Sequence, residues 1–209
     1  QGVSTNDTLT LSEPTPLFAR TGEASSTLYS YSASWGDYDG DGDPDLHVAN
    51  YSQVNSLYRN DAGVMTPVAV TTMTTASSYS FGGAWGDYDG DGDLDLSVGI
   101  NGTNQLWRND GGGAFVNVAS TAGVGNTNIG YATSWGDFDG DGDLDLYVAT
   151  NTTNVLYSND GDGTFTSSGQ AANASVSASA SWGDYDGDGD PDLYVVNTAA
   201  NALYRNDAG

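Results

Sequence analysis

The chain of 209 residues contains no cysteine and no lysine, and it has a single histidine, His47. Without cysteine it can form neither disulfides nor thiolate metal sites. Zinc, which prefers cysteine and histidine ligands, is therefore a poor candidate for any metal site here. The sequence also shows no pairing of a nucleophile with a base, so no catalytic constellation is present. These absences favour a protein that is not an enzyme.

Long apolar runs and basic charge are missing as well. No run of about 18 apolar residues exists that could span a membrane, and the only basic side chains besides His47 are four arginines. Against them stand 28 acidic residues, which give a formal net charge of −24. This charge argues against nucleic acid or anionic membrane as a partner. Because the chain begins with Gln1, we interpret it as a mature chain without its leader or as a segment of a longer protein.

Most of the acidity lies in four copies of one nine-residue motif, Asp-aromatic-Asp-Gly-Asp-Gly-Asp-(Pro or Leu)-Asp. The copies occupy residues 37–45, 87–95, 137–145 and 184–192, and five aspartates in each of the four account for 20 of the 28 acids. Carboxylates at this density repel one another at neutral pH. A compact fold can hold them if a cation lies among them.

The spacing of these aspartates favours calcium, which takes six to eight oxygen ligands. Carboxylates at positions 1, 3 and 5, glycine at position 6 and the carbonyl of position 7 follow the layout of an EF-hand loop. An EF-hand, however, ends in glutamate at position 12, where these copies have valine (Val48, Val98, Val148 and Val195). We therefore predict that position 9 supplies the last carboxylate, in a loop between two strands. Magnesium is a weaker candidate because it needs strict octahedral geometry.

Four calcium ions are expected. The predicted metal-binding residues, with position 7 acting through its carbonyl, are Asp37, Asp39, Asp41, Asp43, Asp45, Asp87, Asp89, Asp91, Asp93, Asp95, Asp137, Asp139, Asp141, Asp143, Asp145, Asp184, Asp186, Asp188, Asp190 and Asp192.

The motif belongs to a repeat that predicts an all-β fold. A tryptophan precedes each copy (Trp35, Trp85, Trp135 and Trp182), at spacings of 50, 50 and 47 residues. A period near 50 with strand-like segments is typical of propeller blades. Each unit reads as four strands, with the acidic loop between the first two. We predict one domain over residues 1–209, a β-propeller of four four-stranded blades.

The ends of the chain predict how this ring closes. The last copy stops before its fourth strand, whereas residues 15–19, with Phe18, resemble a spare fourth strand ahead of the first copy. We expect this N-terminal strand to complete the last blade and close the ring, because closure removes exposed sheet edges. Residues 1–14 would be an extension or linker. The alternative is an open half-ring that pairs with a second chain to make eight blades.

At these residues the sequence resembles the FG-GAP/VCBS repeat family of integrin-type, calcium-binding β-propellers. The resemblance rests on the segment from Trp35 to Leu46 and on the later Leu57-Tyr-Arg-Asn60, and it extends over residues of about 15 to 209. It implies that positions 1, 3, 5 and 9 donate side-chain oxygens and that the loop lies on one rim of the disc. It also implies an extracellular adhesion, lectin or accessory domain. The family normally forms seven or eight blades, which the four copies do not match.

The aromatic and arginine positions of the repeat have simple structural interpretations. We expect Trp35 and its equivalents to pack between blades. The aromatics of the third strand are expected to pack within the blade, with a sugar-stacking platform as the alternative; they are Tyr58, Trp107, Tyr157 and Tyr204. The arginines Arg59, Arg108 and Arg205 are expected to form surface ion pairs with Asp61, Asp110 and Asp207.

Asn-x-Ser/Thr sequons occur at Asn6, Asn50, Asn101, Asn151 and Asn173. Three of them, Asn50, Asn101 and Asn151, fall near the turn between strands two and three, which predicts a glycosylated rim. These features favour a secreted or cell-surface structural scaffold for adhesion. Its expected partner is a protein or a glycan, and self-assembly into a filament is a further expectation. The alternatives are a calcium-dependent lectin and an accessory domain of an enzyme.

Overall fold

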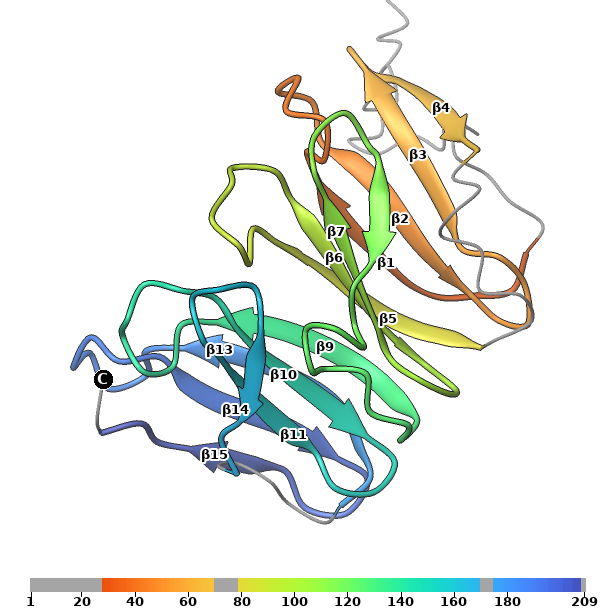
Figure 1. The fold of residues 1–209 in the computed structure, drawn as a ribbon. Helices are drawn as coiled ribbons and strands as arrows, with labels where there is room; N and C mark the ends of the chain where they lie inside the picture. Colours follow the sequence, from red (N-terminus) through yellow and green to blue (C-terminus); the bar gives the residue numbers. More distant parts are fainter. Residues whose placement is uncertain (1–27, 70–78, 170–174, 208–209) are drawn as a thin grey trace, which may run out of the picture.

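The computed structural model describes residues 28–69, 79–169 and 175–207, which form strands and turns without any helix. The strands make four antiparallel sheets (Figure 1), which confirms the all-β prediction. The first sheet contains β1 (Ser30–Gly36), β2 (Asp45–Asn50), β3 (Ser56–Asp61) and β4 (Val64–Val68). The second contains β5 (Ser80–Gly86), β6 (Asp95–Ile100), β7 (Gln105–Asn109) and β8 (Phe115–Asn117). The third contains β9 (Gly130–Gly136), β10 (Asp145–Thr150), β11 (Val155–Asn159) and β12 (Phe165–Ser167), and the fourth β13 (Ser177–Gly183), β14 (Asp192–Asn197) and β15 (Ala202–Tyr204).

Each sheet is a meander whose strands follow one another in chain order. The tryptophan of the first strand always lies opposite a leucine of the second, as in Trp35 opposite Leu46. The glycine after it lies opposite the last aspartate of the acidic motif, as in Gly36 opposite Asp45. The acidic motif is therefore the loop of the first hairpin in every sheet, as the sequence predicted.

The core lies between successive sheets. One cluster joins the first and second sheets through Leu57, Leu96 and Trp107, and another joins the third and fourth through Tyr147 and Leu193. A third cluster lies between the second and third sheets. The first strands β1, β5, β9 and β13 contact one another in that order. The sheets thus stack face to face as blades do.

A tryptophan and a glycine make each junction between sheets. The Trp85 ring lies on Gly36 of the preceding sheet, where an added Cβ would come within 2.6 Å of the ring. The Trp85 indole N–H donates to the Ser34 carbonyl at 3.3 Å. Trp135 lies on Gly86 and Trp182 on Gly136 in the same way. Only glycine leaves room for these rings, which explains the Trp-Gly pair in every repeat.

The predicted ring closure is not formed by the described residues. The first and fourth sheets lie at opposite ends of an open arc (Figure 1). Trp35, which would close the ring, is 61 % exposed, and a Cβ on Gly183 would meet nothing within 4 Å. The prediction that Trp35 packs between blades is therefore wrong, although it holds for the other three tryptophans. The predicted closing strand at residues 15–19 and the extension at residues 1–14 lie outside the described residues.

The aromatics of the third strands pack inside the blades. Tyr58, Trp107 and Tyr157 are buried, and Tyr204 is half-buried. The packing interpretation is confirmed for the three buried rings, which cannot form a sugar-stacking surface. The predicted arginine pairs are present and exposed: Arg59 contacts Asp61 at 2.8 Å, and Arg108 and Arg205 contact Asp110 and Asp207. The described residues contain no helix long and apolar enough to cross a membrane.

Candidate metal centre

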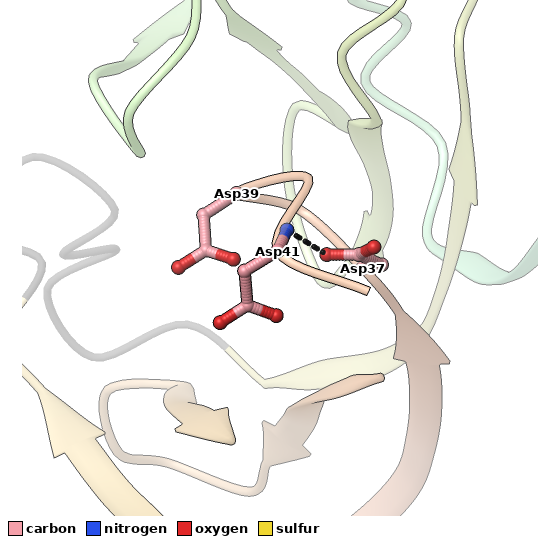
Figure 2. A group of neighbouring side chains, drawn as sticks. All are labelled: Asp37, Asp39 and Asp41. Carbon is pink, nitrogen blue, oxygen red and sulfur yellow. Dashed lines mark hydrogen bonds between the residues drawn. The ribbon is translucent and has the colours of Figure 1, made fainter. Parts of the chain in front are cut away.

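The first carboxylate of each acidic loop holds the loop in a tight coil. Asp37 accepts hydrogen bonds from the backbone N–H groups of Asp41, at 3.1 Å, and Gly42, at 2.9 Å. Figure 2 shows the Asp37–Asp41 bond and the three carboxylates of this loop. Asp137 accepts the bond of position 6 from Gly142 in the same way, and its second bond comes from Gly140 at position 4. The coil is thus built by the same side chains that were predicted to bind metal.

Glycines at positions 4 and 6 allow the coil. In the first loop Gly40 has φ 71° and Gly42 has φ 96°, and the other three loops have similar values. Both angles fall in the left-handed region that side chains other than glycine rarely adopt. Position 6 was expected from the calcium-loop layout, whereas the need at position 4 was not.

The aspartate at position 9 ties the loop to the sheet. Asp95 is fully buried, and its carboxylate accepts backbone N–H bonds from Tyr88 at 3.1 Å and from Asn109 at 2.8 Å. Asp45, Asp145 and Asp192 accept the same pair of bonds. This carboxylate therefore joins the acidic loop, the second strand and the third strand, a role that the sequence reasoning did not foresee.

The asparagine at the end of the third strand was also missed. The Asn109 side chain donates to the carbonyl of Tyr38 in the preceding sheet at 2.7 Å, and Asn159 donates to the carbonyl of Tyr88 at 2.7 Å. The signal was available, because asparagine recurs in the sequence at Asn60, Asn109, Asn159 and Asn206. Asn109, Asn159 and Asn206 connect the first three acidic loops to the next sheet, whereas Asn60 donates to Pro44 of its own sheet.

The aromatic at position 2 makes a second connection between loop and junction. The Tyr38 ring stacks on Trp85 of the next sheet with 6.1 Å between centroids, and Tyr88 stacks on Trp135 at the same distance. Burial raises the pKa of both tyrosines to about 12. The first two acidic loops therefore contact the tryptophan of the next sheet directly.

Every loop brings three carboxylates together. Their oxygens lie within 4.8 Å of one another, a separation at which one cation can contact all three. Positions 1, 3 and 5 converge in the first loop, whereas positions 1, 3 and 9 converge in the others. The groups are Asp37, Asp39 and Asp41; Asp87, Asp89 and Asp95; Asp137, Asp139 and Asp145; and Asp184, Asp186 and Asp192.

The remaining aspartates of the motif lie outside these groups. Position 5 of the last three loops (Asp91, Asp141 and Asp188) lies outside the groups, although it accepts the backbone N–H of position 7 just as Asp41 does. Asp43 at position 7 accepts the N–H of Ala62 at 2.7 Å, and Asp93, Asp143 and Asp190 also lie outside the groups. Position 7 side chains were expected to stay away from the metal, and this placement agrees with that expectation.

The chemistry of the loops fits a hard cation. Asp39, Asp87 and Asp139 each have a buried Oδ1 atom that no hydrogen-bond donor reaches. Burial and then the neighbouring Asp91 carboxylate raise the pKa of Asp89, and burial raises the pKa of Asp95 to about 7. Orphaned acceptors and mutually repelling carboxylates are both relieved when a divalent cation binds. Oxygen-only donors match calcium rather than zinc.

His47 does not belong to this centre. It lies on β2, fully buried against Gly83 and edge-on to Trp85. Burial lowers the pKa of His47 to about 4, so the imidazole is neutral in the folded protein. It is a packing residue of the first junction.

The sequons do not all lie at an exposed turn. Asn50 ends β2, is fully buried, and donates through its amide to the Val54 carbonyl at 2.7 Å and the Ser56 hydroxyl at 3.1 Å. The prediction of a glycosylated rim is therefore wrong for Asn50. Asn101 is exposed and Asn151 is half-buried in turns after the second strand. Asn6 and Asn173 lie outside the described residues.

The family model of the FG-GAP-like repeat matches residues 37–98, 96–148 and 137–195. The chain therefore belongs to the FG-GAP-like repeat family, as its acidic loops and stacked sheets indicated. No curated protein matches the sequence.

Among solved structures, the chain is similar to an Agrocybe aegerita lectin described for specific recognition of non-reducing terminal N-acetylglucosamine. The TM-score is 0.54 at 16 % identity, over 87 % of this chain and 51 % of the lectin chain. The chain thus spans about half the length of that lectin, and the likeness concerns the fold.

The double role of position 9 gives a test within one loop. Asp95→Asn replaces one oxygen acceptor by an amide donor that faces a backbone N–H, so we expect a loss of about 1–3 kcal/mol in the free energy of unfolding. We also expect one fewer bound calcium ion. The matched control is Asp93→Asn, at position 7, which should change stability by less than about 0.5 kcal/mol. Urea unfolding and calcium titration of both variants check this, and equal behaviour of the two would contradict the assignment.

The raised pKa values predict that calcium stabilises the fold more at higher pH. In the calcium-free chain burial raises the pKa of Asp95 to about 7 and of Asp145 to about 6, from 3.8. Their contribution to stability is present below the unfolded pKa and is lost as pH rises through the folded pKa. Calcium favours the ionised carboxylates, so its stabilising effect should grow between about pH 5 and about pH 8.

The measurement is the free energy of unfolding with and without calcium at both pH values. His47, whose lowered pKa destabilises the fold below its unfolded value of 6.5, affects both states and cancels in the difference. A calcium increment that is equal at the two pH values would contradict the role of these carboxylates.

Proposed function

We propose that this chain is a calcium-binding, non-catalytic scaffold of the extracellular space or cell surface, which serves adhesion or assembly. The observation that carries the proposal is the recurrence, in all four loops, of three carboxylates within 4.8 Å of one another. Their loops are connected to the sheet junctions by the position 2 aromatics and the third-strand asparagines. Calcium would thus stiffen the stack of sheets, and proteins or glycans would bind its surface.

We further propose that the sheets form one half of a propeller ring. The open arc of the described residues supports this alternative over a four-bladed ring closed within one chain. In such a half-ring the acidic loops lie along one rim, at the same end of each first hairpin. The rim is acidic without metal and partly neutralised with it.

Native mass spectrometry at increasing calcium concentration tests the calcium role. We expect up to four bound calcium ions per chain and weaker binding of magnesium at the same concentration. Binding of no calcium, or equal binding of magnesium, would contradict the proposal.

Carbohydrate binding is a second candidate, supported by a row of aromatics on the first strands. Tyr31, Phe81 and Tyr131 occupy equivalent positions, with ring centroids 5.1 and 5.0 Å apart. They line a hollow of about 500 Å³ together with Val176, Ala178 and Thr198. Aromatic rings beside hydroxyl groups suit the apolar faces of sugars.

A glycan array with calcium present tests this candidate. Wild-type binding that is lost in Tyr131→Ala and kept in Val116→Ala, which changes an exposed residue of β8, would support a lectin. An array without any signal would contradict the lectin role and leave the scaffold as the remaining candidate.

A further inference from the structure

The three junctions between sheets repeat one set of contacts. A tryptophan ring lies on the glycine of the preceding sheet, and a third-strand asparagine donates to a carbonyl of that sheet. The preceding sheet contributes an apolar face around the glycine. In the third sheet this face includes Tyr147, Ala149 and Leu156, all buried against the fourth sheet.

The fourth sheet presents the same face without a partner among the described residues. Tyr194, Val196 and Leu203 stand at the positions of Tyr147, Ala149 and Leu156, yet they are 44 %, 37 % and 51 % exposed. Tyr185, the counterpart of the half-buried Phe138, is also exposed. A Cβ on Gly183 would meet nothing within 4 Å, whereas a ring fills the corresponding space at Gly36, Gly86 and Gly136. The Gly183 face of the fourth sheet thus has open space where the other three sheets each receive a tryptophan ring.

The first sheet presents the other half of the junction. Trp35 is 61 % exposed, while its equivalents Trp85, Trp135 and Trp182 lie on glycines. Asn60 donates to the Pro44 carbonyl of its own sheet, and no described sheet precedes it. The two unfilled halves stand at opposite ends of the arc (Figure 1), so one described chain does not bring them together.

We propose that the Gly183 face of one copy of this chain receives the Trp35 face of a second copy, head to tail. The occupant follows from the junctions themselves, because three pairs of sheets in this chain already associate through these residue types. Trp35 of one copy then lies on Gly183 of the other, and Asn60 faces the Tyr185 carbonyl. A head-to-tail contact closes two copies into a ring of eight sheets or continues as a longer arc. The proposal adds a partner to the proposed scaffold and is independent of the number of bound calcium ions.

The test is the mass of the calcium-loaded chain in solution, measured by light scattering and native mass spectrometry. We expect the wild type to be a dimer or larger. Trp35→Ser removes the ring, and Gly183→Val fills the space that the ring would occupy. Each variant should be a monomer with unchanged circular dichroism. The control Val116→Ser also loses an exposed apolar side chain, on β8 in the second sheet, and should keep the wild-type mass.

Mixing the two variants gives the decisive outcome. The Trp35→Ser variant retains the Gly183 face and the Gly183→Val variant retains Trp35, so one intact junction can form between them. We expect a one-to-one pair in the mixture although each variant alone is a monomer. A monomeric wild type, variants that keep the wild-type mass, or a mixture without pairs would overturn the proposal. Calcium-dependent stability with a monomeric wild type would leave the scaffold role standing while removing this contact.

Discussion

Removing calcium with an excess of chelator should lower the melting temperature of this chain sharply. At about 100-fold over its dissociation constant, each bound ion adds roughly 2.7 kcal/mol to stability. Four such ions together are comparable to the whole free energy of unfolding of a typical domain, about 5–15 kcal/mol. Tyr38 and Tyr88 connect the loops directly to the junctions between sheets, so the loss should spread through the stack.

Scanning calorimetry in calcium, in chelator, and in chelator saturated with calcium measures this effect. The saturated chelator is the control for any action of the chelator itself, and it should give the melting temperature found in calcium. Magnesium should restore only part of the loss. An unchanged melt in excess chelator would mean that the loops are solvated acidic turns.

The second large effect is expected for Gly86→Val. An added Cβ at Gly86 would come within 2.8 Å of the Trp135 ring, which packs against the buried Phe165 and Tyr88. Because the ring cannot move without opening the junction, we expect a loss of about 3 kcal/mol. For a domain of this size that lowers the melting temperature by roughly 6–12 °C.

Gly183→Val is the matched control, because it places the same side chain at the same position of the repeat where nothing lies within 4 Å. Measured at a dilution where copies do not associate, it should melt close to the wild type. Equal losses in Gly86→Val and Gly183→Val would show that the glycines serve the strand and not the junction.

The repeat made much of the fold predictable. The tryptophan period and the four acidic motifs marked four units, and the all-β sheets follow these units closely. The fourth strands expected in the second and third units are β8 and β12. Ring closure was not predictable in this way, because it depends on how far each sheet turns relative to the next. Trp35 has the same sequence surroundings as Trp85 but no described sheet to pack on.

The acidic loops were also predictable from the sequence only in part. Their aspartate spacing indicated which carboxylates could converge, and positions 1 and 3 do converge in every loop. Asp95 and its equivalents were assigned to the metal alone, whereas they also accept two backbone N–H bonds. Those donors come from the loop and from a strand 14 residues away, as in Asn109, and spacing within the motif contains no sign of them. Asn50 was misplaced for the same reason, since a sequon pattern does not report burial.

The most direct test of the central claim is anomalous scattering from crystals grown with calcium. The acidic loops should each show one anomalous peak among the carboxylates of positions 1 and 3, with the position 7 carbonyl beside it. Four occupied loops in one chain are the predicted result. Loops without peaks at saturating calcium, with the aspartate side chains turned to solvent, would contradict the calcium-binding role proposed for this chain.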